Sequence, residues 1–193
     1  MIKIGLTGGI GSGKTTVSRI FQALGYPVYI SDTRASWLIN HRHEIKRDLI
    51  ALFGESVYLP TGELDKKKFA SLIFNDKKRI DQVNKIVHPV VTEDFLEWSE
   101  SQNTPFLFFE SAILFEAGLT PLFDHIITVT ADRETRILRA MKRDAVSREK
   151  IIERINNQLP DREKCLQSDF VIHNNDSDYL LEQIIEIVKK LKA

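Results

Sequence analysis

The first twenty-five residues contain the feature that most restricts the fold of this chain. An apolar run, IKIGL at 2–6, leads into the glycine-rich stretch GGIGSGKT at 8–15, and apolar residues at helical spacing follow up to Gly25. The stretch satisfies the phosphate-binding pattern G-x-x-x-x-G-K-[ST], which requires a strand before it and a helix after it. We therefore expect the chain to begin with a strand, a phosphate-binding loop (P-loop) and a helix.

The residue types in this loop suit the phosphates of a nucleotide. Glycines let successive backbone N–H groups surround a phosphate, and the N-terminus of the following helix adds positive potential. The lysine reaches the β- and γ-phosphates, and the threonine hydroxyl can ligate Mg²⁺. The loop is expected to bind ATP with Mg²⁺, whereas the alternative of a chance glycine turn conflicts with the agreement of pattern and context. The predicted nucleotide ligands are Gly8, Gly9, Gly11, Ser12, Gly13, Lys14, Thr15 and Thr16.

Composition limits the classes of partner. The 193 residues are 42% apolar and 28% charged, which is ordinary for a globular protein. The 27 basic residues balance the 27 acidic ones, so no overall charge attracts nucleic acid or an anionic membrane. Cys165 is the single cysteine, and no apolar run is long enough for a signal peptide or a bilayer span. We expect a cytoplasmic protein, with a monomer favoured, and no nucleic-acid or membrane partner.

Four further apolar runs predict the rest of a sheet. Each is followed by sequence with helical character, the last by an amphipathic segment at 179–193. Strands that alternate with helices form a parallel sheet with right-handed crossovers. The predicted fold is therefore an α/β P-loop NTPase with a doubly wound parallel sheet of about five strands. The four runs are PVYIS at 27–31, TPFLFFE at 104–110, HIITVT at 125–130 and DFVIHN at 169–174.

Between about residues 33 and 102 the strand signals nearly vanish, and charged amphipathic segments predict a helical insertion. Within it, apolar residues at 80–95 share one helix face, and Pro89 either starts a new helix or kinks the existing one. His88 precedes this proline, and taken alone a structural role is favoured for it.

Two carboxylates stand at the ends of predicted strands. Glu110 closes FLFFE, where P-loop proteins commonly have an acid near the metal; the alternative is an acid that faces solvent. Asp32 follows the second strand, at the edge where α/β sheets bind ligands, and could accept a proton from an attacking hydroxyl; the alternative is a helix N-cap. We predict that Glu110 joins Thr15 at the metal and that Asp32 is the catalytic base.

Three arginines, Arg136, Arg139 and Arg143, recur at the spacing of one helix face. Such a stripe usually forms a solvated surface. Beside a triphosphate site, however, guanidinium groups that neutralise a transferring phosphoryl group are the favoured interpretation. Arg154 and Gln158 form a weaker pair four residues apart, which a plain helix surface explains equally well.

Several of these segments together resemble the dephospho-coenzyme A kinase family, whose members phosphorylate the ribose 3′-hydroxyl of dephospho-CoA. The resemblance covers most of the chain outside about 36–75, and ILFEAG and HPVV make it more specific than the P-loop alone. Ile30 and Ala112 depart from the family's usual D-A-D and D-x-P-L-L-F-E patterns, and Glu110 replaces the aspartate of the second. The matching segments are IGLTGGIGSGKTT, PVYISD, VNKIVHPVV, ILFEAG, RAMKRD with ERINNQL, and DFVIHNN.

The resemblance implies a kinase of three parts with ATP and Mg²⁺. These are a nucleotide-binding core at 1–34, 104–138 and 163–193, a helical domain at 35–103 for dephospho-CoA, and a helical lid at 139–162. It implies catalytic roles for Asp32, Lys14, Arg139 and Arg143. The implied acceptor contacts are Asp32, His88, Glu110, Leu114 and Phe115, and Asn174 is implied near the adenine of ATP.

Two other functions compete with this interpretation. A P-loop kinase for another small acceptor, such as a nucleoside, nucleotide or sugar, would use the same loop, base and lid. A GTP-dependent switch would need D-x-x-G and N-K-x-D motifs. The segment at 84–87 begins like the second of these but lacks its aspartate, so the switch is disfavoured.

Overall fold

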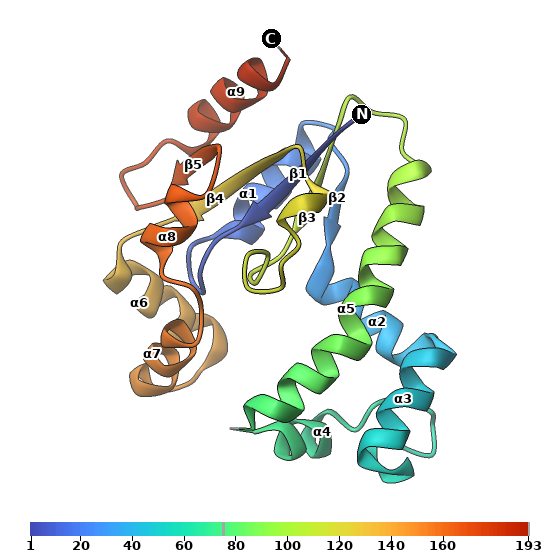
Figure 1. The fold of residues 1–193 in the computed structure, drawn as a ribbon. Helices are drawn as coiled ribbons and strands as arrows, with labels where there is room; N and C mark the ends of the chain where they lie inside the picture. Colours follow the sequence, from blue (N-terminus) through green and yellow to red (C-terminus); the bar gives the residue numbers. More distant parts are fainter. Residues whose placement is uncertain (75, 193) are drawn as a thin grey trace. The chain divides into compact units, whose positions relative to one another are not determined.

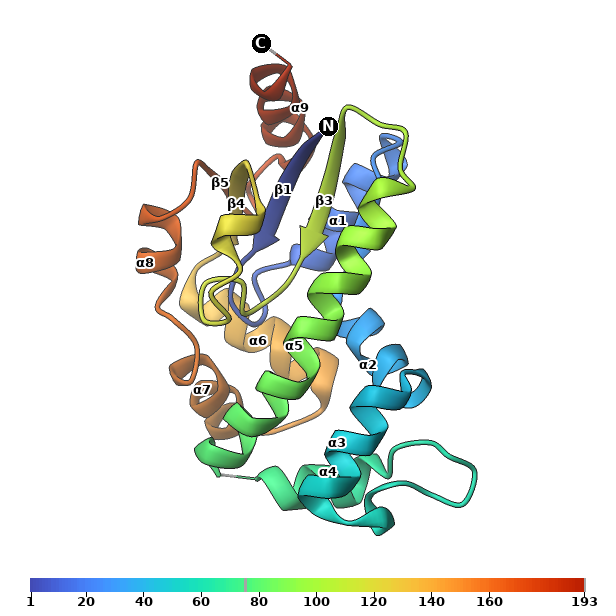
Figure 2. The same ribbon diagram turned by 45° about the vertical axis from the view of Figure 1, so that its right-hand side comes forward.

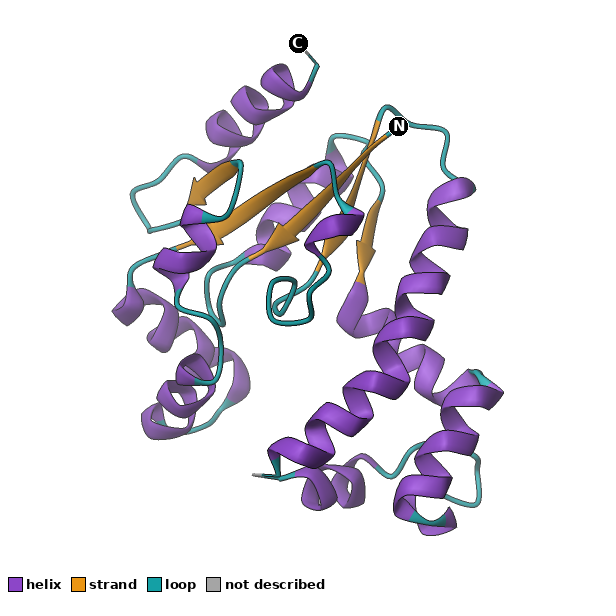
Figure 3. Cartoon of the chain, in the orientation of Figure 1, coloured by secondary structure: helices purple, strands orange, loops and turns teal. Residues whose placement is uncertain are grey.

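The computed structural model describes residues 1–74 and 76–192, and the chain divides into two compact units. The first unit is Met1–Ile30 together with Gln102–Ala193, and the second is Ser31–Ser101. The strands belong to the first unit, whereas helices and loops make up the second (Figure 3). Ala193, the last residue of the expected closing helix, lies outside the described residues.

The first unit is built on a five-stranded sheet in the order β2-β3-β1-β4-β5 (Figure 1). Every neighbouring pair is parallel, which confirms the predicted fold class. The central strand β1 lies between β3 and β4, and the chain builds the two halves of the sheet on either side of it. Ligands bind at such a topological switch point in α/β folds. The strands are β1 Ile2–Thr7, β2 Val28–Ile30, β3 Phe106–Glu110, β4 His125–Thr130 and β5 Phe170–His173.

Helices α1 and α9 cover one face of this sheet, where Phe21 of α1 stacks on Phe108 with ring centroids 3.9 Å apart. On the other face, Gly5 leaves room for Leu114 and Phe123. Strand β3 is buried throughout, which explains why its sequence is a continuous apolar run. The helices of this unit are α1 Lys14–Ala23, α6 Arg133–Asp144, α7 Arg148–Asn156, α8 Asp161–Leu166 and α9 Leu180–Leu191, with a 3-10 turn, η2, at Thr120–Leu122.

The second unit contains no strand among its described residues, 31–74 and 76–101. Arg34 and Asp94 join α2 to α5 through two hydrogen bonds of 2.7 Å. Pro89 lies inside α5, so of the two alternatives for this proline the start of a new helix is wrong. The helix instead bends part-way along its length (Figure 2), as helices do at proline. The elements are α2 Ser31–His41, α3 His43–Phe53, η1 Glu55–Val57, α4 Lys66–Ile73 and α5 Lys77–Glu100.

None of the helices in the described part of the chain combines the length and the apolar character that crossing a membrane would require.

Candidate functional site

The P-loop, Gly8–Thr15, connects the end of β1 to the start of α1. Gly13 has a φ of 94°, in the left-handed region, and an added Cβ there would lie 1.9 Å from Nδ2 of Asn174. The Lys14 ammonium donates to the carbonyl of Gly8 at 2.8 Å, so this side chain folds over the loop. Thr16 and Val17 donate the first backbone hydrogen bonds of α1, both to the carbonyl of Gly13, so the N–H groups of Lys14 and Thr15 precede the hydrogen bonds of the helix. Loop, lysine and helix start therefore form a cradle suited to phosphate.

Three side chains from distant parts of the sequence bind the backbone of the P-loop. Arg136 Nε donates to the carbonyl of Ile10 at 2.9 Å, and Gln158 Oε1 accepts from the N–H of the same residue at 2.9 Å. Asn174 Nδ2 donates to the carbonyl of Ser12 at 2.8 Å. These partners are 126, 148 and 162 residues apart in the sequence. The fold of the first unit therefore fixes the loop conformation.

Arg136 is buried beneath the P-loop, with 4% of its surface exposed. Its guanidinium pairs with Asp161, whose carboxylate also accepts from the Thr130 hydroxyl at 3.1 Å. A Cβ added to Gly9 would lie 2.0 Å from Arg136 Nη2, so only glycine fits beside this pair. The interpretation that Arg136 shares a phosphate-contacting face with the other two arginines is therefore wrong. Its side chain instead binds the backbone of the P-loop at Ile10 and the carboxylate of Asp161.

Arg139 and Arg143 bind groups of the protein itself. Arg139 donates to the carbonyl of Asn174 and to Asp176, both at 2.7 Å. Arg143 binds Asp144 at 2.7 Å, and its hydrogen bond lowers the pKa of that carboxyl. Asn174 thus connects α6 to the P-loop, because its carbonyl binds Arg139 while its amide binds the loop.

The two predicted carboxylates lie at the end of β3 and just after the neighbouring strand β2. Glu110 ends β3 and is 7% exposed, so the alternative of a solvent-facing acid is wrong. It is in register with Leu6, the residue before the last of β1. Asp32 is the second residue of α2, two residues beyond the end of β2, and so lies in the first turn of the helix rather than at its N-cap. A carboxylate in a first turn interacts favourably with the helix dipole.

The residues that the resemblance implies at the acceptor differ in exposure. Leu114 is 0% exposed and packs over Gly5, so its side chain belongs to the core of the first unit. Phe115, next in the sequence, is partly exposed. His88 lies in α5, and burial lowers the pKa of its imidazole, which favours the neutral form at pH 7.

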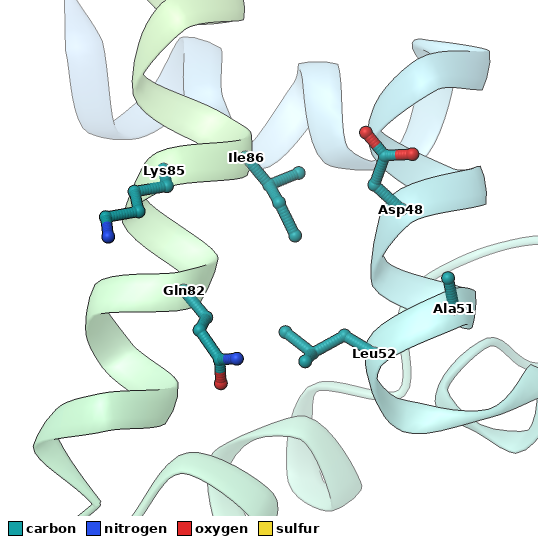
Figure 4. A pocket seen from close by; sticks show the side chains of 6 residues that line it. All are labelled: Asp48, Ala51, Leu52, Gln82, Lys85 and Ile86. Atoms are coloured by element: carbon teal, nitrogen blue, oxygen red, sulfur yellow. The ribbon is translucent and has the colours of Figure 1, made fainter.

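The second unit contains a pocket of about 410 Å³ between α3 and α5 (Figure 4). Leu52 and Ile86 point into it from the two helices, whereas the ammonium of Lys85 points away. The lining is therefore mainly aliphatic, with polar groups at its border. The lining residues are Asp48, Ala51, Leu52, Gln82, Lys85 and Ile86.

A model of the dephospho-CoA kinase family matches residues 2–179 of the chain. The chain belongs to this family. The dephospho-CoA kinase of Bacteroides fragilis is 42% identical over 188 residues, which cover 97% of this chain and 91% of the relative. The crystal structure of TT1252 from Thermus thermophilus is similar, with a TM-score of 0.84 and 33% identity over 99% of this chain and 96% of that one. The Campylobacter jejuni dephospho-CoA kinase shares the fold, with a TM-score of 0.70 and 22% identity over 98% and 96% of the two chains.

In this member of the dephospho-CoA kinase family, sequence reasoning missed part of the support of the P-loop. The sequence did contain a pattern that indicates burial of Arg136. This residue lies four positions before Ala140, so both side chains are on the same side of α6, and Ala140 is buried. Gln158 offered no such signal. Helix α7 ends at Asn156, so the alternative of a plain helix surface is wrong for Gln158.

Proposed function

We propose that this protein transfers the γ-phosphoryl group of ATP to the ribose 3′-hydroxyl of dephospho-CoA, giving coenzyme A and ADP in the last step of coenzyme A synthesis. The observation that carries the proposal is membership of the dephospho-CoA kinase family, with 42% identity to a relative over 97% of the chain. The P-loop, whose backbone is held by Arg136, Gln158 and Asn174, supports a nucleoside triphosphate as the donor.

Phosphoryl transfer of this kind depends on positioning and on neutralisation of charge. Lys14 and the N–H groups of the P-loop would hold the β- and γ-phosphates. Asp32 would orient the acceptor hydroxyl and accept its proton. Arg139 and Arg143, which pair with Asp176 and Asp144, would neutralise charge on the transferring group, because a guanidinium has further N–H donors for phosphate oxygens.

Mg²⁺ would be held by the Thr15 hydroxyl and the Glu110 carboxylate, which are the oxygen ligands that this ion prefers. When bound, the ion supplies positive charge to the phosphates. The observation that favours Glu110 is its place at the end of β3, in register with Leu6 near the end of β1, because the P-loop leaves the sheet from the same edge. Asn174 would lie near the adenine, on the loop after β5.

The three parts that the resemblance implies would bind the two substrates. We assign the nucleotide to the core at 1–34, 104–138 and 163–193, the lid to 139–162, and dephospho-CoA to the helical part at 35–103. His88 and Phe115 are the proposed acceptor contacts, whereas Leu114, which the resemblance also implies there, is assigned to the core because it is 0% exposed. The pocket between α3 and α5 is the proposed site for the pantetheine arm, because aliphatic walls with polar borders suit its methyl and amide groups.

The substitution Ala51→Trp should fill this pocket, because Ala51 lines it. We expect the KM for dephospho-CoA to rise about tenfold, corresponding to roughly 1.4 kcal/mol, while the KM for ATP stays within about twofold. Steady-state kinetics with each substrate varied in turn measure both values. Ala70→Trp is the matched control, because Ala70 is an exposed alanine of α4 in the same unit and outside the pocket. An unchanged KM for dephospho-CoA in Ala51→Trp would remove the pocket from the site.

The reaction itself can be tested by mass spectrometry of dephospho-CoA incubated with the protein and Mg-ATP. We expect a product with one added phosphate on the ribose, and a Lys14→Ala variant should lose about 10- to 100-fold in kcat/KM, the value of a hydrogen bond to a charged group. Parallel reactions with a nucleoside, a nucleoside monophosphate and a sugar test the alternative kinase. Preference for any of them over dephospho-CoA would overturn the proposed acceptor.

A further inference from the structure

Two loops leave the sheet from neighbouring strands at the same edge. One is the P-loop after β1, and the other, residues 111–119, follows β3 and is called the β3 loop here. The N–H of Ser111 donates to the carbonyl of Leu6 at 3.0 Å, so the β3 loop begins beside the end of β1. The β3 loop includes Phe115, a proposed acceptor contact, whereas the P-loop is the proposed donor site. Their separation therefore affects the geometry of transfer.

The side-chain amide of Gln158 lies between these two loops. Its Oε1 accepts from the N–H of Ile10 in the P-loop at 2.9 Å, and its Nε2 is 3.5 Å from the carbonyl of Ala112 in the β3 loop. The first contact is a good hydrogen bond, and the second is at the upper limit of distance. One amide group thus contacts the backbone of both loops.

Lys164 of α8 strengthens the weaker of these connections. Its side chain is 0% exposed, and its ammonium donates to the carbonyl of Ala112 at 2.9 Å and to Glu116 at 2.8 Å. Glu116 Oε1 also accepts from the N–H of Leu159 at 2.8 Å. A buried ammonium group is tolerated only where partners compensate for its lost hydration. The two partners of the Lys164 ammonium, Ala112 and Glu116, belong to the β3 loop, so this loop is fixed at two points.

We propose that Gln158 and Lys164 are positioning residues that set the β3 loop against the P-loop during phosphoryl transfer. The inference rests on the proposed function, since it requires the β3 loop to contact the acceptor. Neither side chain needs to touch a substrate, because both act through backbone groups of Ile10 and Ala112 and through Glu116. Displacing a reacting group by about 1 Å can cost about 100-fold in rate, so a small shift of the β3 loop should be visible in kinetics.

The test is Lys164→Met, which keeps the length of the side chain but removes the ammonium. We expect kcat to fall about 10- to 100-fold and the KM for dephospho-CoA to rise several-fold, with the KM for ATP within about twofold. Lys164→Arg should restore most of kcat, because a guanidinium can donate to both partners. Arg162→Met is the matched control, since Arg162 is an exposed cation of the same helix. Gln158→Leu should raise both KM values, because Ile10 also loses its acceptor.

Several outcomes would overturn the inference. Wild-type kinetics in Lys164→Met would do so, as would a lower kcat with unchanged KM values and no rescue by arginine, which is the pattern of partial unfolding. If circular dichroism shows that Lys164→Met does not fold, Glu116→Gln replaces it, and wild-type kinetics in that variant would count equally against the inference. If the wild type prefers another acceptor, the proposed function fails, and the same comparison with that acceptor still tests Gln158 and Lys164.

Discussion

Asp32→Asn is expected to lower kcat for dephospho-CoA phosphorylation by about 10²- to 10⁴-fold, the range for loss of a positioned general base. Asparagine has nearly the shape of aspartate and can still orient a hydroxyl, but it cannot accept its proton. The affinity for ATP should stay within about twofold, because the proposed contacts of ATP, in the P-loop, in α6 and after β5, do not include Asp32. Steady-state kinetics give kcat, and isothermal titration of ATP gives the affinity.

The matched control for this prediction is Asp81→Asn, which removes an exposed carboxylate from α5 of the same unit and should leave kcat unchanged. If kcat fell equally in both variants, the cause would be the changed net charge of the second unit and not the loss of a base at Asp32. Wild-type turnover in Asp32→Asn would remove the base role from Asp32. If only the affinity for ATP fell, Asp32 would be a nucleotide contact instead.

The sheet was predictable because its signals are local. HIITVT coincides with β4, and FLFFE, a run without polar alternation, is buried on both faces of the sheet as such runs usually are. Pro89 was not predictable in the same way. A proline removes one helical hydrogen bond, and whether the helix ends or continues depends on packing along its other residues. In α5 four buried apolar residues, Val83, Val87, Val91 and Phe95, lie on both sides of the proline along the helix.

The candidate site was predictable where chemistry requires a fixed motif and not where it requires a distant partner. The glycine and lysine spacing identified the P-loop by itself. The contact of Asn174 with Ser12 spans 162 residues, so the resemblance could indicate Asn174 without indicating what it binds. Lys164 carries no sequence signal at all, since a lysine on a short charged helix is expected at the surface. Its burial follows from the carbonyl of Ala112 and the carboxylate of Glu116, which only the folded chain brings to it.

Arg136→Met is expected to lower the free energy of unfolding by about 3–5 kcal/mol, the usual cost of removing one partner of a buried ion pair. The substitution leaves Asp161 with the Thr130 hydroxyl as its remaining hydrogen-bond donor among the contacts described above, and it removes the donor to the carbonyl of Ile10. Urea or thermal unfolding followed by circular dichroism measures the change. Arg133→Met, at an exposed arginine of the same helix, should change stability by less than about 0.5 kcal/mol.

The double variant Arg136→Met, Asp161→Leu separates the two effects of this pair. Removing both charges should recover part of the lost stability, because no unpaired buried carboxylate remains. The KM for ATP should nevertheless stay raised in the double variant, since Ile10 still lacks its donor and the P-loop is less well fixed. Recovery of stability together with a wild-type KM for ATP would show that Arg136 contributes only to packing. A loss below about 1 kcal/mol in Arg136→Met would contradict the burial of the pair itself.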